Sequence, residues 1–385
     1  MKDFSLVQNL STLRKLPKTW VIKNFEEVLE DNSAGNFKIP KSKFESSGKI
    51  PIIDQGKNKI AGYLSDEKKI VKSEPPYIIF GDHTRIFKYI DFKFVMGADG
   101  VKVLQDKERN NYTKYIYYFL SQLNIPDTGY NRHFKYLKDI KIPLPPLDEQ
   151  KKIAAILDAA DEFRQKTKAL LTKYDELAQS LFLDMFGDPV VNPKGWEVVK
   201  FSEVGKLDRG KSKHRPRNAP ELLGGSHPLI QTGDIANSGI FVKTYDSTYS
   251  DIGLAQSKKW PSGTLCITIA ANIAKTGILT FNACFPDSVV GFIPNENTNN
   301  IYAHFWMSFL QKILEETAPE SAQKNINLAI LRDLDYPLPP IELQNQFAER
   351  IQEIESQKAN AEASLQKADD LFNCLLQKAF KGELT

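Results

Sequence analysis

The sequence predicts an α+β fold in which two similar globular domains, each mixing α and β elements, are separated by two long α-helices that form an antiparallel coiled coil. Three observations predict this fold. The chain repeats itself as if two copies were related by a pseudo-two-fold axis, the first part of each copy is rich in strand-forming residues, and the second part carries a long heptad pattern. A chain of 385 residues is also long enough for two or three domains.

The internal repeat fixes the order of the elements. IPLPPLDEQKKIAAIL at 142–157 reappears as YPLPPIELQNQFAERI at 336–351, displaced by 194 positions, and the match runs without a gap from Asn131/Asn325 to Phe186/Phe380. PKTWVIKNFEEV at 17–28 reappears as PKGWEVVKFSEV, displaced by 176. Between these ends, IPIIDQG matches HPLIQTG at a displacement of 177, and YIYYFL matches FWMSFL at 190. A series that stays in order predicts two domains of the same topology.

The first part of each copy alternates β-branched and aromatic runs with Gly, Asn and Asp, as in YIIFGDH at 77–83 and TLCITIA at 264–270. Such runs are typical of short strands joined by loops. We expect these two globular domains at residues 1–142 and 188–336.

The second part of each copy follows a Pro-Leu-Pro-Pro segment, which favours a helix starting at Asp148 or Glu342. No further Pro or Gly occurs until Gly187 and Gly382. About 39 helical residues would make a rod of roughly 58 Å. We expect the two long helices at residues 143–187 and 337–385.

Apolar residues recur in steps of three and four along both helices, which predicts a coiled-coil seam. The first helix would contribute Ile153, Ile156, Ala160, Phe163, Thr167, Leu170, Tyr174, Leu177 and Leu181. The second would contribute Phe347, Ile351, Ile354, Lys358, Ala361, Leu365, Ala368, Phe372 and Leu375. Thr167 and Lys358 would lower stability and help to fix the register. The alternative is two amphipathic helices that each pack on their own globular domain.

Composition excludes several classes of protein. The net charge is only +3, so nucleic-acid binding would have to come from local basic patches. Cys266, Cys284 and Cys374 lack the spacing of a metal site. The N-terminus does not resemble a signal peptide, and the most apolar window, residues 265–281, is interrupted by polar side chains. We therefore expect a cytoplasmic protein that does not interact with membranes.

GKLDRGKS at 205–212 matches the phosphate-binding loop pattern G-x-x-x-x-G-K-[ST]. A working loop needs a helix directly after its Lys-Ser, but Pro216 and Pro220 follow here. The matching stretch of the first copy, LEDNSAGN, has no such loop. Catalytic motifs are also missing from the sequence, so we expect no enzymatic activity in this chain, with a P-loop ATPase as an alternative.

Both copies carry candidate DNA-binding residues. Cationic loops suit contacts to DNA phosphates, and arginine suits guanine edges; the alternative is that these loops are ordinary solvated surface. In the first copy the candidates are Lys57, His83, Thr84, Arg85, Lys88, Asn131, Arg132 and His133. In the second copy they are Arg209, Lys211, Lys213, His214, Arg215, Arg217, Gln231, Thr232, Asn272 and Lys275. Because Ile326 and Asn327 replace Arg132 and His133 in the repeat, any DNA site should be asymmetric.

These features resemble the specificity (S) subunit of a Type I restriction-modification system over nearly the whole chain. The likeness is carried by two variable units, each followed by Pro-Leu-Pro-Pro-(Leu/Ile)-x-x-Gln and a long helix. Leu147, Gln150 and Ile153 match Ile341, Gln344 and Phe347, whereas Glu149 is replaced by Leu343. The resemblance implies that each unit is a target recognition domain that reads one half of a bipartite site in double-stranded DNA, and that the helices set the gap between the halves.

The resemblance also implies partners. Two methyltransferase (M) subunits would dock on the helices, bind S-adenosylmethionine and methylate adenine, while restriction (R) subunits would use ATP and Mg. No cofactor is then expected in this chain. Half-sites about one helical turn apart, ~34 Å, lie on the same face of B-DNA, and a rod of the expected length can hold two domains at such a spacing. The alternative function is a coiled-coil adaptor whose two domains bind proteins rather than DNA.

Overall fold

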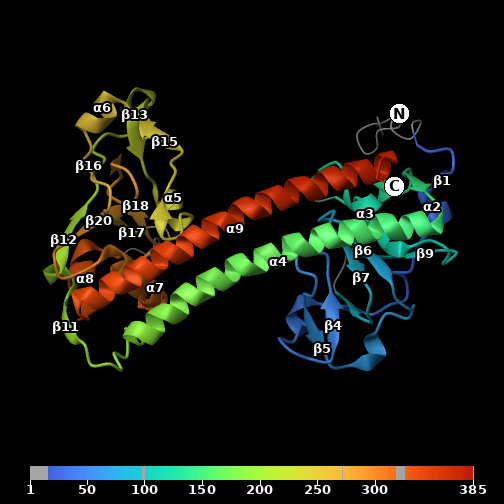
Figure 1. Ribbon diagram of the computed structural model, residues 1–385, viewed down its shortest axis with the longest axis horizontal. Helices are drawn as coiled ribbons and strands as arrows, with labels where there is room; N and C mark the ends of the chain where they lie inside the picture. Colours follow the sequence, from blue (N-terminus) through green and yellow to red (C-terminus); the bar gives the residue numbers. More distant parts are fainter. Residues whose placement is uncertain (1–15, 98–99, 130, 271, 318–325, 385) are drawn as a thin grey trace. The chain divides into compact units, whose positions relative to one another are not determined.

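The computed structural model describes residues 16–97, 100–129, 131–270, 272–317 and 326–384 (Figure 1). The chain divides into two compact units: Met1–Lys168 with Ala363–Thr385, and Ala169–Glu362. Two long helices, α4 (Leu147–Phe186) and α9 (Ile341–Lys381), are divided between the units, so that each unit contains one part of each helix. Both begin one residue before the starts predicted at Asp148 and Glu342, and end just before Gly187 and Gly382. The expected segment bounds at 143 and 337 lie four residues too early, because those residues still belong to strands.

Among the described residues of the first unit, two four-stranded sheets and one two-stranded ribbon are formed. The first sheet is antiparallel, in the order β2 (Leu29–Asp31), β9 (Val101–Asp106), β6 (Tyr77–Gly81), β7 (Phe87–Ile90). The second has the order β3 (Lys38–Ile39), β8 (Val95–Gly97), β4 (Ile50–Ile53), β5 (Gly62–Leu64), with β8 parallel to β3 and β4. The ribbon pairs β1 (Val21–Asn24) with β10 (Lys141–Leu144).

Helix α3 (Thr113–Ser121) covers the core of the first unit. Its Tyr115, Ile116 and Phe119 share one buried cluster with residues of α4 and α9. Shorter helices complete the unit: α2 (Phe25–Val28), η2 (Lys41–Lys43), η3 (Glu67–Lys69) and η4 (Phe134–Tyr136).

The second unit repeats this plan. Its antiparallel core sheet has the order β12 (Gly205–Arg209), β20 (Val289–Pro294), β17 (Leu265–Thr268), β18 (Thr276–Leu279), with β14 (Phe241–Val242) added parallel at the edge. The second sheet has the order β15 (Ser247–Tyr249), β13 (Leu223–Leu229), β19 (Ala283–Cys284), β16 (Lys259–Trp260). The ribbon pairs β11 (Glu197–Lys200) with β21 (Asp335–Leu338), and the helices are α5 (Thr232–Ala236), α6 (Asp251–Ala255), α7 (Asn300–Thr317), α8 (Leu328–Arg332), η5 (Phe201–Glu203) and η6 (Pro220–Leu222).

The shared topology confirms the predicted repeat of an α+β domain. β1 pairs with β10 through Val21↔Leu144, and β11 pairs with β21 through the repeat-related Glu197↔Leu338. β4 runs parallel to β8 just as β13 runs parallel to β19. The units differ at one sheet edge, where β3 is parallel to β8 but β16 is antiparallel to β19.

A buried glutamine ties the start of each long helix to its globular domain. Gln150 Oε1 accepts a hydrogen bond from the Tyr112 amide at 2.9 Å, and its Nε2 donates to the Pro145 carbonyl at 2.9 Å. Gln344 makes the equivalent bonds with the Asn299 amide and the Pro339 carbonyl, at 2.9 and 2.8 Å. The sequence motif Pro-Leu-Pro-Pro-x-x-x-Gln therefore encodes a helix start in which the amide side chain satisfies backbone groups that would otherwise be unpaired.

The repeat register of α3 and α7 differs from the prediction. Tyr115 and Tyr302 donate their hydroxyls to the equivalent Pro143 and Pro337 carbonyls, at 2.7 and 2.8 Å. This equivalence corresponds to a displacement of 187, whereas the match of YIYYFL with FWMSFL assumed 190. The predicted displacement is wrong because a slip of three residues keeps a similar helix face, so apolar pattern alone does not separate the two registers.

The two long helices run antiparallel within each unit, which confirms the predicted coiled coil. In the first unit Ile153 and Leu157, early in α4, share a core cluster with Ala379 and Phe380, late in α9. In the second unit Phe182 and Phe186, late in α4, share a cluster with Phe347 and Ile351, early in α9. Figure 1 shows the two helices in green and red.

The predicted seam of the first helix is wrong at four positions. Their side chains point to solvent, with exposed fractions of 37, 52, 41 and 50% for Ile156, Phe163, Leu170 and Leu177. The neighbouring Leu157, Arg164, Leu171 and Ala178 lie buried or half-buried in their place, whereas Ile153, Ala160, Thr167, Tyr174 and Leu181 lie on the buried side as expected. The second helix buries or half-buries all nine of its predicted seam residues.

Candidate nucleic-acid interface

In the first unit, three loops meet where β6 ends and β7 begins. Thr84 Oγ1 donates to the Gln55 carbonyl at 2.6 Å, and the His83 amide donates to Gln55 Oε1 at 3.2 Å. His83 Nδ1 lies 3.2 Å from the carbonyl oxygen of Asn131. These bonds join the loop after β4, the β6–β7 turn and the segment before η4. Exposed donors on these loops are Lys57, Thr84, Asn131 and Arg132.

Arg85 completes this cluster through an ion pair. Its backbone adopts a φ of 63°, and its Nη2 donates to Asp127 Oδ2 at 2.8 Å. Asp127 Oδ1 accepts a second bond from the Gly129 amide at 3.0 Å. The Gly129 amide and then the Arg85 guanidinium lower the pKa of the Asp127 carboxyl, so the pair is ionised at neutral pH.

Two predicted contact residues of this unit are buried instead. The side chain of Lys88 is 6% exposed, and its Nζ donates to the carbonyls of Asp54 and Asn58 at 2.8 and 2.6 Å. His133 is fully buried, with Nδ1 2.8 Å from the Asp82 carbonyl. The prediction of direct DNA contact is wrong for Lys88 and His133, because their polar atoms hold neighbouring loops together. Burial also lowers the pKa of Lys88.

The second unit uses the same end of its core sheet. Asn272, exposed and with a φ of 50°, and Lys275 form the β17–β18 turn that corresponds to the β6–β7 turn. The Lys275 amide donates to Thr268 Oγ1 at 3.1 Å. Gln231 and Thr232 stand at the start of α5, whose Ile235 packs in a cluster with residues of β17 and β18. The structure therefore brings the predicted residues of both turns to equivalent places in the two units.

The GKLDRGKS segment is not folded as a nucleotide-binding loop. Gly205–Arg209 is strand β12, and the Gly210 amide donates to the Val289 carbonyl at 2.9 Å. A side chain at Gly210 would meet the carbonyl oxygens of Phe285 and Pro286 at 2.3 Å, so this glycine serves close backbone packing. No helix follows directly after Ser212; in this described stretch the next helical residues are those of η6.

The basic loop that follows β12 folds back onto the turn before β20. Arg217 Nη2 donates to Asp287 Oδ1 at 2.5 Å, and Arg215 Nη2 lies 3.6 Å from Asp287 Oδ2. Arg209 Nε donates to the Asp287 carbonyl at 2.9 Å. The Lys213 and His214 amides both donate to Gln256 Oε1, and Lys211 is exposed. Because Arg209 pairs with Val290 and Thr268 with Val289, this loop lies at the same sheet end as the β17–β18 turn.

Sequence reasoning missed Gln55, Asp127 and Asp287. The carboxylates hold arginines 42 and 70 positions away, so no local pattern points to them. Gln55 was recoverable in part, since it occupies the repeat position of the predicted Thr232.

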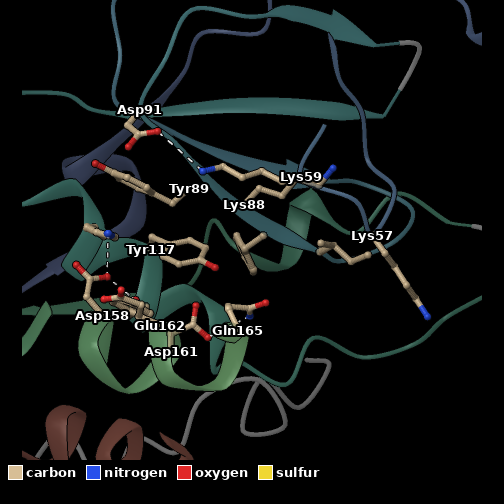
Figure 2. Close-up of a pocket in the computed structure, with 14 residues that line it drawn as sticks. Lys57, Lys59, Lys88, Tyr89, Asp91, Tyr117, Asp158, Asp161, Glu162 and Gln165 are labelled. Atoms are coloured by element: carbon tan, nitrogen blue, oxygen red, sulfur yellow. Dashed lines mark hydrogen bonds and ion pairs between the residues drawn. The ribbon is translucent and has the colours of Figure 1, made fainter. Parts of the chain in front are cut away.

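A cavity of about 760 Å³ lies beside the interface of the first unit, between β7, α3 and α4 (Figure 2). In the figure Asp158, Asp161 and Glu162 rise from α4 toward Tyr117 and Tyr89 on the opposite wall. Lys59 pairs with Asp91, 3.9 Å away, at its rim. The lining carries charges of both signs: the carboxylates of Asp91, Asp158, Asp161 and Glu162, and the amines of Lys57, Lys59, Lys88 and Lys114. Its counterpart in the second unit measures about 390 Å³ and is lined by Lys275, His304 and Glu355, among others.

The described residues also lack two other kinds of feature. No group of three or more His, Cys, Asp or Glu side chains there could hold a metal ion. None of the helices in those ranges is long and apolar enough to span a membrane. Asn325, where the long repeat begins, lies outside the described residues.

Comparison with known proteins gives one consistent result. The family model "Type I restriction modification DNA specificity domain" matches residues 17–173 and again residues 193–368. The specificity subunit of the Type I restriction enzyme EcoBI from Escherichia coli is 23% identical over 433 residues, covering 98% of this chain and 89% of that protein. The S subunit of a Type I restriction-modification system from M. genitalium, a solved structure, aligns with a TM-score of 0.59 at 16% identity over 95% of this chain and 98% of that one. A chain from a structural study of complex assembly and conformational transition of the type I R-M system aligns with a TM-score of 0.56 at 16% identity, covering 96% and 99%. The last two likenesses concern the fold.

Proposed function

We propose how this chain recognises DNA. The proposal starts from one premise: the chain belongs to the family of Type I restriction-modification DNA specificity proteins. Its relatives are specificity subunits, the components that recognise DNA sequence and leave catalysis to others. In our proposal each unit reads one half of an asymmetric bipartite site in double-stranded DNA. The methyltransferase subunits, with S-adenosylmethionine, and the restriction subunits, with ATP and Mg, assemble around it in the cytoplasm.

The observation that carries this proposal is the pair of equivalent loop clusters. Both units have the same topology, and both gather exposed donors at the same end of the core sheet. The donors themselves differ: the first unit offers Lys57, Thr84, Asn131 and Arg132, and the second offers Lys211, Lys213, Arg215, Arg217 and Asn272, with the half-buried Lys275 beside them. Lysines and arginines suit phosphate contacts, whereas arginine and asparagine also suit base edges. Because the two units share a topology but present different donors, the DNA site they recognise together should be asymmetric.

The experiment maps which DNA sequences become methylated when the chain is assembled with its methyltransferase subunits. Arg132→Ala should relax or abolish recognition of one half-site, and Asn272→Ala should do so for the other. Lys173→Ala, an exposed position on α4, is the control and should leave both halves unchanged. Variants that alter both halves together, or neither, would overturn the assignment of one half-site to each unit.

The long helices would set the spacing between the halves. Helices of 40 and 41 residues are each roughly 60 Å long, and half-sites one turn apart need ~34 Å. Inserting one heptad into each helix should lengthen the tolerated gap while both half-sites keep their sequences. Methylation mapping that shows an unchanged gap would refute this role of the helices.

Exposed apolar residues of α4 suggest where methyltransferase subunits dock. Ile156 and Phe163 in the first unit, and Leu170 and Leu177 in the second, recur every seven residues and face solvent. Large apolar side chains outside a helix seam are typical of a protein-binding face. Phe163→Glu should therefore abolish co-purification of a methyltransferase subunit without lowering the melting temperature. Thr172→Glu, at an exposed position on the opposite side of α4, should leave co-purification unchanged. Retention of the methyltransferase by Phe163→Glu would contradict this docking face.

A further inference from the structure

We propose that Asp287 and Asp127 act as internal stand-ins for DNA phosphate, each occupying the arginines of its unit's reading loops until cognate DNA displaces it. The inference rests on the proposed function, because it assumes that these loops contact DNA. It adds a device that lowers the occupancy of random sequence, which lacks the base contacts that keep a cognate site bound.

Asp287 contacts three arginines: Arg209 at the end of β12, and Arg215 and Arg217 of the basic loop. Its two carboxylate oxygens face Arg217 and Arg215 separately, and its backbone carbonyl accepts a hydrogen bond from Arg209. One residue thus engages every arginine that the sequence assigned to DNA contact in this loop. A phosphodiester presents two charged oxygens in the same way, so the carboxylate satisfies the bonding geometry that a DNA backbone would otherwise satisfy.

This engagement is reversible because it is exposed. The side chains of Asp287, Arg217 and Arg215 are 38, 46 and 55% exposed. Exposed ion pairs contribute little stability and exchange readily. A DNA backbone can replace the carboxylate, since neutralising phosphates releases condensed counterions. The replacement costs the same on every sequence, whereas base contacts offset that cost only on the cognate site.

The first unit supplies an independent instance with unrelated residues. Asp127 holds Arg85 at 2.8 Å, and Asp127 is 67% exposed. The Gly129 amide fixes its second oxygen, so the carboxylate keeps its position when the arginine leaves. Arg85 and Asp127 occupy different repeat positions from Arg217 and Asp287. The same arrangement at the same end of both sheets is therefore not a by-product of the internal repeat.

A purely positioning role for Asp287 makes the opposite prediction. If the carboxylate only orients the arginines toward DNA, its removal weakens binding to all sequences. If it competes with phosphate, its removal tightens binding to random sequence. The sign of the change on random DNA separates the two roles.

The test uses the full chain assembled with its methyltransferase subunits and a short duplex of random sequence, with binding followed by fluorescence anisotropy across a salt series. Asp287→Asn should tighten binding about fivefold and steepen the plot of log K against log salt by about 0.9, the value for one added phosphate contact. Asp246→Asn removes the same charge at an exposed position of the same unit and should change both quantities little. Equal behaviour of the two variants, or weaker binding by Asp287→Asn, would overturn the inference.

One further variant, Arg217→Ala, separates this inference from the proposed function. If Arg217→Ala weakens DNA binding while Asp287→Asn has no effect, the loop contacts DNA and only the stand-in role fails. If Arg217→Ala has no effect either, the proposed reading loop fails with it. Methylation mapping gives the positive signature: Asp287→Asn should relax only the half-site read by the second unit, and Asp127→Asn only the other half-site.

Discussion

Arg164 of α4 donates a hydrogen bond of 2.6 Å from Nε to Oδ1 of Asp369 of α9. At positions displaced by 194, Lys358 of α9 pairs in the same way with Asp175 of α4. Each cation also meets a carboxylate one turn earlier on its own helix, Asp161 at 3.0 Å and Glu355 at 4.0 Å. Both units therefore carry the same polar lock between the long helices, at the same position of the repeat.

This lock predicts a measurable coupling. Arg164→Glu should lower the free energy of unfolding by about 1–3 kcal/mol, because it removes the ion pair, places like charges together and loses the guanidinium stacked 4.3 Å from the Phe372 ring. Exchanging the charges with Arg164→Asp and Asp369→Arg should recover part of the loss. Urea denaturation of the single and double variants measures the coupling.

The exposed Lys173→Glu serves as the control for the lock and should change stability by less than about 0.5 kcal/mol. If the loss of unfolding free energy in the double variant equals the sum of the losses in the two single variants, the pair does not hold the register.

The buried glutamines make a second prediction. Gln150→Leu should lower the free energy of unfolding by about 2–4 kcal/mol, because the Tyr112 amide and the Pro145 carbonyl lose their partner inside the protein. Gln344→Leu should cost a similar amount through the Asn299 amide and the Pro339 carbonyl. Gln165→Leu, at an exposed position of α4, is the matched control. Chemical denaturation that gives equal stabilities for Gln150→Leu and Gln165→Leu would contradict this account.

A third prediction separates a structural cation from a DNA-contacting one. Lys88→Met should lower the melting temperature, because two loop carbonyls lose a charged donor, at a cost of about 2–3 kcal/mol. Arg132→Ala should leave the melting temperature unchanged and weaken DNA binding by the assembled complex. Thermal unfolding and anisotropy on the same preparations provide the comparison. The reverse pattern, with Arg132 stabilising the fold and Lys88 affecting only DNA affinity, would contradict the assignment.

Features set by local chain chemistry were predicted from the sequence. Prolines before each long helix, and the lack of Gly or Pro within it, predicted helix starts at Asp148 and Glu342, one residue after the observed starts at Leu147 and Ile341. The repeat likewise predicted two domains of one topology, because equivalent residues make equivalent strands and turns.

Features set by distant partners were not predictable. On α4, steps of three and four fit two seam phases, and apolar character favoured Phe163 over Arg164. Arg164 takes the seam position instead, because Asp369, 205 positions away in the sequence, neutralises its charge. Lys88 and His133 were predicted to lie on the surface for the same reason, because the carbonyl oxygens that contact their buried side chains belong to other loops.

The last prediction concerns acid stability of the second unit. His304 of α7 lies with Nδ1 2.8 Å from Thr276 Oγ1 and lines the cavity that also contains Lys275, Lys358, Asp175 and Glu355. Burial lowers the pKa of His304 to about 4, from an ordinary value of 6.5. The unfolded chain thus takes up this proton first as the pH falls. The stability contributed by the neutral ring is complete above about pH 6.5 and is lost as the pH falls toward 4.

With partial exposure allowed for, this loss should amount to about 2 kcal/mol. Urea denaturation at neutral pH and near pH 4 should therefore show a smaller decrease for His304→Gln, which retains a polar partner for Thr276, than for the unaltered chain. His214→Gln, on an exposed loop of the same unit, should leave the decrease unchanged. Because the carboxylates of the chain titrate in the same range, only the difference between the variants reports on His304; an identical decrease in all three proteins would show that the ring is not held neutral by burial.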